Sequence, residues 1–145
     1  MQALAWNSIW HEDLIDMDEK SFFWVGSEID KSYGYREKRD SQTIQDIHGH
    51  GDDNNAVYNG EWLVGTDTRQ GLGGLTRRDG TTYYGFFKNN RFDGKGKLKY
   101  VEEDLQGRKH FMGQFSAGRI HGRGCVVMRN GDAYKGKWVR NQLLG

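Results

Sequence analysis

The feature that most constrains this chain is a short pattern, aromatic-x-Gly-x-aromatic, which occurs four times after residue 57. The four copies are Tyr58-Gly60-Trp62, Tyr83-Gly85-Phe87, Phe111-Gly113-Phe115 and Tyr134-Gly136-Trp138. Their first residues stand 25, 28 and 23 positions apart, a period typical of proteins built from stacked copies of one small unit. The repetition therefore favours a surface that binds partners over a single catalytic pocket.

The spacing inside each copy predicts a β-strand. Residues i, i+2 and i+4 of a strand lie on the same face of a sheet, so each copy places two rings on one face with a glycine between them. We expect a ring from the next unit to fill the space beside that glycine. Under this interpretation all units share one core.

A glycine pair after the pattern predicts a strand that returns. The pairs are Gly71 and Gly73, Gly94 and Gly96, and Gly122 and Gly124. A Gly or Asn stands seven residues after each first aromatic, at Gly65, Asn90, Gly118 and Asn141. The dipeptides Asp79-Gly80 and Asn130-Gly131 precede two of the copies, and such residues favour tight turns. Each unit is thus predicted to be a β-hairpin with one buried face.

Four such units in register resemble MORN (membrane occupation and recognition nexus) repeats over residues 58–145. The resemblance implies an all-β fold, an elongated and twisted single-layer antiparallel sheet of successive hairpins. It covers three full units and an unfinished fourth that stops at Gly145. Among proteins with similar repeats are organisers of the cytoskeleton and parts of ciliary and flagellar assemblies such as radial spokes. In others the repeats have been proposed to recruit proteins to membranes.

Two segments precede the repeats. The sequence Ile47-His48-Gly49-His50-Gly51 is similar to residues 120–124, so we interpret residues 33–57 as a degenerate half-repeat or a cap. Residues 1–32 form an acidic arm with a predicted short amphipathic helix, whose apolar stripe is Trp6, Trp10, Leu14 and Met17. The helix either covers one end of the sheet or anchors in another protein, and Trp24 is placed to extend the same contact.

Charge is divided unequally along the chain. Residues 1–57 carry 5 basic and 12 acidic side chains, a net charge of −7, whereas residues 58–145 carry 16 and 8, a net charge of +8. On the outward face the period-2 pattern predicts one basic row at Lys95, Lys97 and Lys99 and another at Lys135 and Lys137. Nearby in the pattern are Arg77, Arg78, Arg123 and Arg129.

The basic rows have more than one interpretation. Exposed lysines protect strands from aggregation, and this alone is sufficient to explain them. They also suit an acidic protein, an anionic lipid surface or the chain's own acidic arm. Nucleic acid is disfavoured because the rings that would stack on bases are placed on the buried face.

The link between the second and third units is longer than its counterparts. Residues 101–110 are predicted to form an extended hairpin tip that carries Glu102, Glu103 and Asp104. We regard this tip as a further candidate for partner binding.

The sequence lacks the usual signatures of catalysis. His48 and His50 have no second pair of ligands at metal-binding spacing, and no glycine-rich phosphate loop or serine nucleophile elbow occurs. We therefore expect no enzyme activity, no cofactor, no metal and no small-molecule substrate. The single cysteine, Cys125, suits a reducing compartment and is predicted to be half-exposed on its strand.

No apolar run has the length of a membrane span, which predicts a cytoplasmic protein without a transmembrane segment. These observations favour a non-catalytic scaffold or assembly subunit that binds other proteins in a cytoskeletal complex, with a ciliary or flagellar axoneme as the most concrete setting. The alternative is a membrane-recruitment or regulatory module that binds anionic phospholipids through the basic rows.

Overall fold

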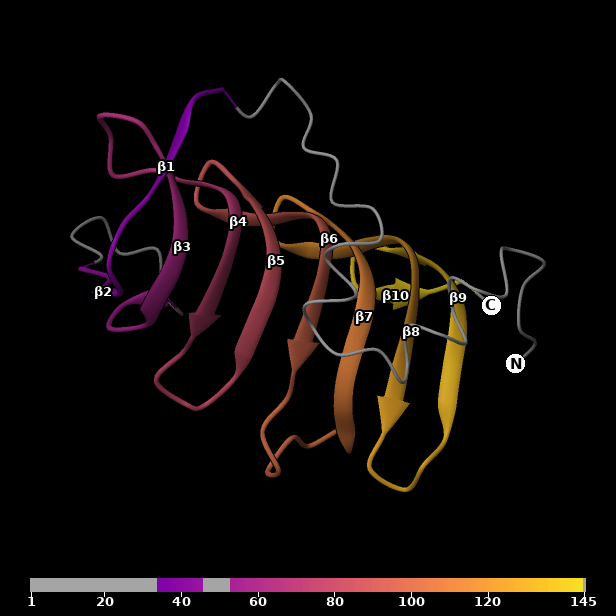
Figure 1. Cartoon of the computed structure of the whole chain (residues 1–145). Helices are drawn as coiled ribbons and strands as arrows, with labels where there is room; N and C mark the ends of the chain where they lie inside the picture. The colour runs from indigo at the N-terminus through magenta and orange to yellow at the C-terminus, as the bar shows by residue number, and fades with distance from the viewer. Residues whose placement is uncertain (1–33, 46–52, 145) are drawn as a thin grey trace.

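The structure is a computed structural model that describes residues 34–45 and 53–144. All its strands belong to one ten-stranded antiparallel sheet in which they follow one another almost in chain order, as the colours of Figure 1 show. Their bounds are β1 Arg36–Lys38, β2 Gln42–Thr43, β3 Val57–Leu63, β4 Arg69–Thr76, β5 Thr82–Lys88, β6 Arg91–Lys99, β7 Arg108–Ser116, β8 Arg119–Met128, β9 Ala133–Val139 and β10 Gln142–Leu143. The predicted all-β sheet of successive hairpins is confirmed.

Each repeat unit is one hairpin. The four units are β3–β4, β5–β6, β7–β8 and β9–β10, and the last of these pairs through only two residues of β10. Short amino-terminal strands run along the outer edge of β3, where β1 pairs with its second half and β2 with its first. The similar sequence at residues 47–51 lies outside the described residues. So do the predicted helix with Trp6, Trp10, Leu14 and Met17, and Trp24, which is predicted to extend its contact.

The turns have the conformation that their sequences predict. Asn89–Asn90, Ala117–Gly118 and Arg140–Asn141 each have two consecutive positive φ angles, which matches the right-handed twist of the flanking strands. Gly80 and Gly131, at the joints between units, have φ of 99° and 97°. The Gly/Asn position of the repeat is therefore explained by backbone conformation.

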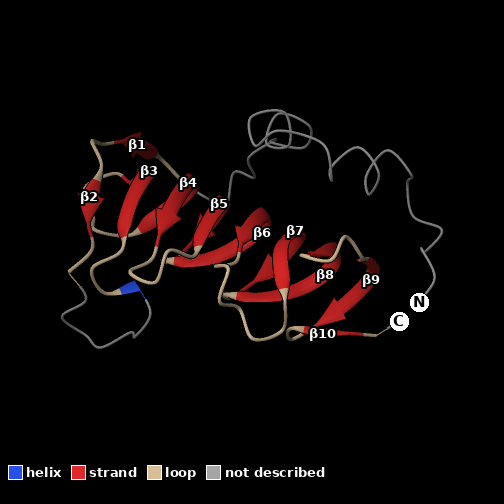
Figure 2. Cartoon of the chain, turned by 90° about the horizontal axis from the view of Figure 1, so that it is seen from below, coloured by secondary structure: helices blue, strands red, loops and turns tan. Residues whose placement is uncertain are grey.

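An extra residue interrupts the first strand of three units. The register shifts between Gly60 and Trp62, and again at the equivalent positions of β5 and β7. These bulges bend the strands, and Figure 2 shows the bent strands of the sheet in profile. Glu61, Phe86 and Gln114 are the bulged residues.

The repeated rings form one continuous ladder on the face that we call the aromatic face. In spatial order the ladder is Trp62, Tyr58, Phe87, Tyr83, Phe115, Phe111 and Trp138. Neighbouring rings meet edge to face, with centroids 5.0 to 5.4 Å apart. Each such contact contributes about 0.5–1.5 kcal/mol beyond the burial of area. The second ring of each unit thus packs on the first ring of the unit before it.

The space beside each glycine is filled differently from our prediction. A Cβ on Gly60, the glycine between Tyr58 and Trp62, would meet the carbonyl oxygen of Leu72 on the returning strand at 2.6 Å and the hydroxyl of Tyr58 at 2.9 Å, and Gly85 and Gly113 are enclosed in the same way with Tyr83 and Phe111. A Cβ on Gly73 of the returning strand would in turn lie 2.6 Å from the ring of Tyr58. These rings come from the same unit, so the expectation that the next unit supplies them is wrong. The reason is that the returning strand of a hairpin lies directly beside the strand that bears the ring.

The fourth unit departs from this pattern. Tyr58, Tyr83 and Phe111 are at most 1% exposed, whereas Tyr134 is 37% exposed. The prediction that all four opening rings are core residues is wrong for Tyr134. Its strand β9 pairs with β10 only at Val139 and Trp138, so no described residue lies beside it as Gly73 lies beside Tyr58.

Long polar side chains cover part of the aromatic face. The guanidinium of Arg69 lies over the rings of Tyr58 and Phe87 and forms an ion pair with Asp53 at 3.0 Å. Arg77 pairs with the other oxygen of Asp53 at 3.1 Å. A single carboxylate therefore holds two arginines over the rings.

Candidate interaction surface

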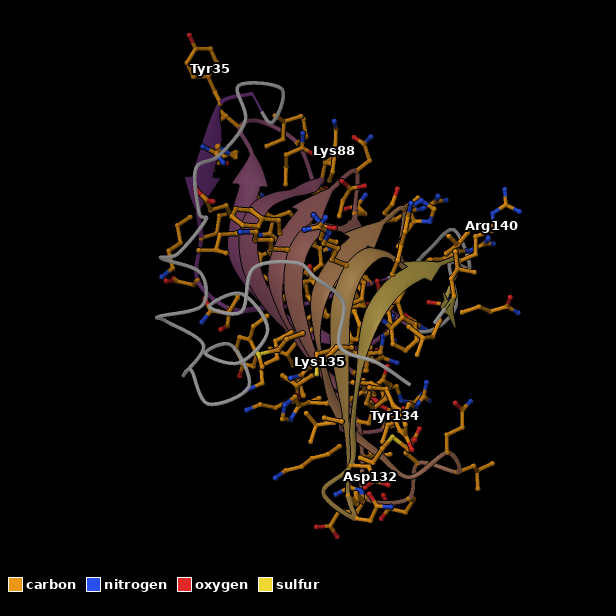
Figure 3. The ribbon with its side chains drawn as sticks, turned by 90° about the vertical axis from the view of Figure 1, so that its right-hand side faces the viewer. Tyr35, Lys88, Asp132, Tyr134, Lys135 and Arg140 are labelled. Atoms are coloured by element: carbon orange, nitrogen blue, oxygen red, sulfur yellow. The ribbon has the colours of Figure 1, made fainter. Side chains whose placement is uncertain are left out.

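The opposite side of the sheet, which we call the second face, bears the lysine rows. Pairing across β6 to β9 places Lys97, Met112, Cys125 and Lys135 in one line. Figure 3 shows Tyr134 and Lys135 on opposite sides of the ribbon, as expected for adjacent strand residues. The two predicted rows thus lie on one surface, with two strands between them.

The two lysine rows lie on opposite sides of the second face, one on β6 and the other on β9. Lys95 lies opposite Gln114, and Lys99 lies opposite His110. On the other side Lys137 lies opposite Arg123, whose amide donates a hydrogen bond to the Gln114 side chain at 2.7 Å. The structure therefore brings together all five lysines of the predicted rows and Arg123, one of the four arginines predicted nearby.

The other three arginines predicted near the rows do not belong to the second face. Arg77 pairs with Asp53 and lies over the ring of Phe92 on the aromatic face. Arg78 and Arg129 are exposed near turns between hairpins. The guanidinium of Arg129 donates to the carbonyl oxygen of Tyr100 at 3.2 Å.

Two apolar side chains occupy the centre of the second face. Met112 is 1% exposed and Cys125 is 2% exposed, so the prediction of a half-exposed cysteine is wrong. Burial raises the pKa of the Cys125 thiol to about 11, although the charge of Lys135 acts in the opposite direction. The thiol is thus protonated at neutral pH.

Sequence reasoning missed Met112 and a third apolar residue on this face. Phe86 is 5% exposed and occupies the bulge position of the second unit, where the other two units have Glu61 and Gln114. Glu61 and Gln114 each accept a hydrogen bond from the amide after a positive-φ glycine, at 2.7 Å. The sequence signal that could have identified this apolar position is Phe86, which stands where the other two units have a hydrogen-bond acceptor.

His110 also belongs to the second face. Burial lowers its pKa to about 4, and the nearby charges of Lys97, Lys109 and Lys99 act in the same direction. The imidazole is therefore neutral at physiological pH, and the positive charge of this face comes from lysine and arginine.

The predicted tip between β6 and β7 is held by its own charges. Arg108 forms two hydrogen bonds with the Asp104 carboxylate, at 2.9 and 2.7 Å, and its guanidinium stacks 4.0 Å from the centre of the Tyr100 ring. The hydrogen bonds from Arg108 lower the pKa of Asp104. Asp104 therefore has a structural partner, while Glu102 and Glu103 are exposed.

A groove of about 500 Å³ lies on the aromatic face beside the same tip. Tyr100 and Arg108 line it from the tip, and Phe111, Tyr134 and Trp138 line it from the repeats. It marks the end of the ring ladder, where Tyr134 is partly exposed.

A family model for the MORN repeat matches residues 83–104 and 111–133. Each match begins at the opening aromatic of a hairpin, Tyr83 on β5 or Phe111 on β7. Two adjacent hairpins of this chain, β5–β6 and β7–β8, are therefore MORN repeats. MORN repeats are a non-enzymatic repeat type associated with binding of proteins or lipids, and they occur in proteins of membranes and the cytoskeleton.

The chain is also similar to part of a much larger protein. Over 90 residues it is 31% identical to alsin of Mus musculus and 30% identical to alsin of Homo sapiens. The match covers 62% of this chain but only 5% of alsin. The similarity is thus confined to a repeat segment.

Within residues 34–45 and 53–144, no three His, Cys, Asp or Glu side chains come together as metal ligands would. The described part of the chain also has no helix of the length and apolarity needed to cross a membrane.

Proposed function

We propose that this chain is a non-catalytic scaffold subunit that binds other proteins through the second face of its repeat sheet. The setting that we favour is a cytoskeletal complex, such as a ciliary or flagellar axoneme with radial-spoke-like assemblies. The predicted amino-terminal arm and the acidic tip would supply further contacts.

One observation carries this proposal: the two faces of the sheet differ in the kinds of side chain that they present. The rings of the aromatic face contact one another, the glycines of the returning strands and two arginines that are held by Asp53. The second face instead combines basic rows with a buried apolar centre at Met112 and Cys125. Protein interfaces commonly have such an apolar centre with a polar rim.

The second candidate function is recruitment to membranes. Lys95, Lys97, Lys99, Lys135 and Lys137 lie on one face, and each basic residue near an anionic bilayer contributes about 1 kcal/mol of attraction. A bilayer would satisfy the charges but would not require a defined apolar centre. We therefore rank an acidic protein surface first.

Detergent extraction of cells that produce the tagged chain separates the two functions. A scaffold subunit stays with the cytoskeletal pellet after non-ionic detergent, whereas a membrane-recruited protein is released with the lipid. In parallel, the purified chain is floated with vesicles containing phosphatidylserine at low and physiological salt. A chain that stays in the detergent pellet and does not float with vesicles supports the scaffold. A chain that detergent releases and that floats with vesicles supports the membrane module. A chain that detergent releases and that does not float contradicts both functions.

A further inference from the structure

We propose that the acidic, tryptophan-bearing amino-terminal segment of this same chain binds the second face and covers Met112 and Cys125. The inference rests on the geometry of that face and does not depend on a cytoskeletal role. It makes the segment an internal competitor of any external partner for the same surface.

Burial at the centre of the second face is the first observation. Met112 and Cys125 are 1% and 2% exposed, yet the ten described strands form a single sheet and so none of them lies over this face. Aliphatic stems of neighbouring lysines cover part of such a surface. The described strands therefore offer Met112 and Cys125 as an apolar centre on which a further segment can pack.

Charge complementarity is the second observation. Residues 1–33 carry seven acidic side chains and two lysines, a net charge of −5. The second face carries Lys95, Lys97, Lys99, Arg123, Lys135 and Lys137. The segment and the face therefore attract each other, and a covalent link between them raises their effective concentration to the millimolar range.

Dimensions also fit a helix on this face. The lysine rows lie on β6 and β9, three strand spacings or about 14 Å apart. A helix with its side chains is about 10–12 Å wide, so one helix lies between the rows. The predicted stripe of Trp6 and Trp10 would meet Met112, and sulfur and aromatic rings pack favourably.

The segment is also long enough and starts in a suitable place. Residue 34 joins β1 at the outer edge of β3, and β7 lies five strand spacings, or about 24 Å, from β1. A chain of this length reaches up to about 3.3 Å per residue, several times that distance. The connection therefore permits contact within one molecule.

The first test uses Cys125, the single cysteine of the chain, as a reporter of the cover. Full-length protein is alkylated with iodoacetamide under native conditions, and wild type is compared with the variant E12K/D13K/D16K. We expect alkylation at least about tenfold faster in the variant, because local opening then exposes the thiol. A matched control, D40K/E102K/E103K, reverses three acidic residues elsewhere and should label at the wild-type rate.

Unfolding is separated from loss of the cover by a compensating variant. Adding K95E, K97E and K99E to the arm variant restores the attraction with opposite signs and should restore slow alkylation, and it leaves Lys135, whose charge acts on the thiol, unchanged. Equal rates in wild type and the arm variant would overturn the proposal, as would faster alkylation that the compensating changes do not slow.

The second test needs no substitution. A carbodiimide joins carboxylates to lysines in a dilute equal mixture of ¹⁴N- and ¹⁵N-labelled wild-type chains. We expect links from residues 12–19 to Lys97, Lys99, Lys135 or Lys137 within single-isotope chains. Mixed-isotope links would show that a second copy occupies the face, and absence of these links would also refute the proposal. Because only purified protein is used, both tests are independent of the cytoskeletal assignment.

Discussion

The two faces of the sheet differ in how similar the residues at equivalent positions of successive units are. On the aromatic face the same ring-glycine-ring arrangement recurs along β3, β5 and β7, and its side chains are buried in one ladder. On the second face the equivalent bulge position is Glu61, then Phe86, then Gln114. Regularity on the first face serves stacking, whereas the second face varies from one unit to the next.

The comparison teaches where substitutions should affect folding and where they should affect binding. Ring and glycine positions are fixed by contacts within and between hairpins. The lysines of the second face are half-buried or exposed, whereas the rings of the ladder are buried. Changes on the aromatic face should therefore destabilise the fold, and changes to the basic rows should leave it intact.

The largest expected effect is at the centre of the ladder. Phe87 is fully buried and contacts Tyr58, Tyr83 and Phe92, so Phe87→Ala should lower the free energy of unfolding by about 3–5 kcal/mol. Exposed Lys137→Ala on the second face should change it by less than about 0.5 kcal/mol. Urea unfolding measures both. Similar losses in the two variants would remove the distinction between the faces.

Two adjacent glycines on β4, Gly73 and Gly74, compare the two faces of the sheet through a single added methyl group. Gly73→Ala directs its methyl group into the buried Tyr58 ring and should cost about 1–3 kcal/mol. In Gly74→Ala the methyl group lies 3.1 Å from Tyr84, a half-buried side chain that can move, so the change should be near neutral. Thermal unfolding of the pair is the measurement. Equal effects would contradict the assignment of rings to one face.

A pH effect tests the electrostatics of the second face. His110 has a pKa of about 4 in the folded chain against 6.5 for the ordinary group, so the unfolded state binds more protons between these values. Stability should therefore fall as the pH drops from 6.5 towards 4, by roughly 1 kcal/mol after allowance for solvent screening. His110→Gln should flatten this part of the stability curve relative to wild type. A parallel decline in both proteins would show that His110 is not responsible.

The smallest expected effect concerns the tip. Asp104→Asn removes the charge that Arg108 contacts and should cost below about 1 kcal/mol at neutral pH. Since Arg108 lowers the pKa of Asp104, this contribution exists above the ordinary carboxyl pKa and disappears as the pH falls through the lowered value. Exposed Glu102→Gln is the control and should be neutral. A loss for Glu102→Gln as large as for Asp104→Asn would argue against a structural role of the pair.

Much of the fold could be predicted because its determinants are local. Period-2 spacing assigned the rings to one face, and Gly80 and Gly131 marked turns through their conformational freedom. The source of the ring beside each glycine could not be predicted, because it depends on the cross-strand register and on the bulges at Glu61, Phe86 and Gln114.

The candidate site was predicted only in part, for a physical reason. Alternation along β6 and β9 placed the lysines outward, but the register needed to align them with Met112 and Cys125 is a property of the whole sheet. Alternation also places Cys125 on a face that a single-layer sheet leaves open, so its burial was not foreseeable. Asp104 looked like a surface acid because its pairing with Arg108 depends on the geometry of the loop.

The central claim is that the aromatic face builds the sheet and the second face binds. It is tested most directly by measuring thermal stability and retention in the detergent-insoluble cytoskeleton for K97E/K135E. R78E/R140E, which reverses two exposed arginines at turns, is the matched control. We predict that both variants unfold at the wild-type temperature and that only K97E/K135E loses retention. Equal retention of the two variants, or loss of retention explained by unfolding of K97E/K135E, would contradict the claim.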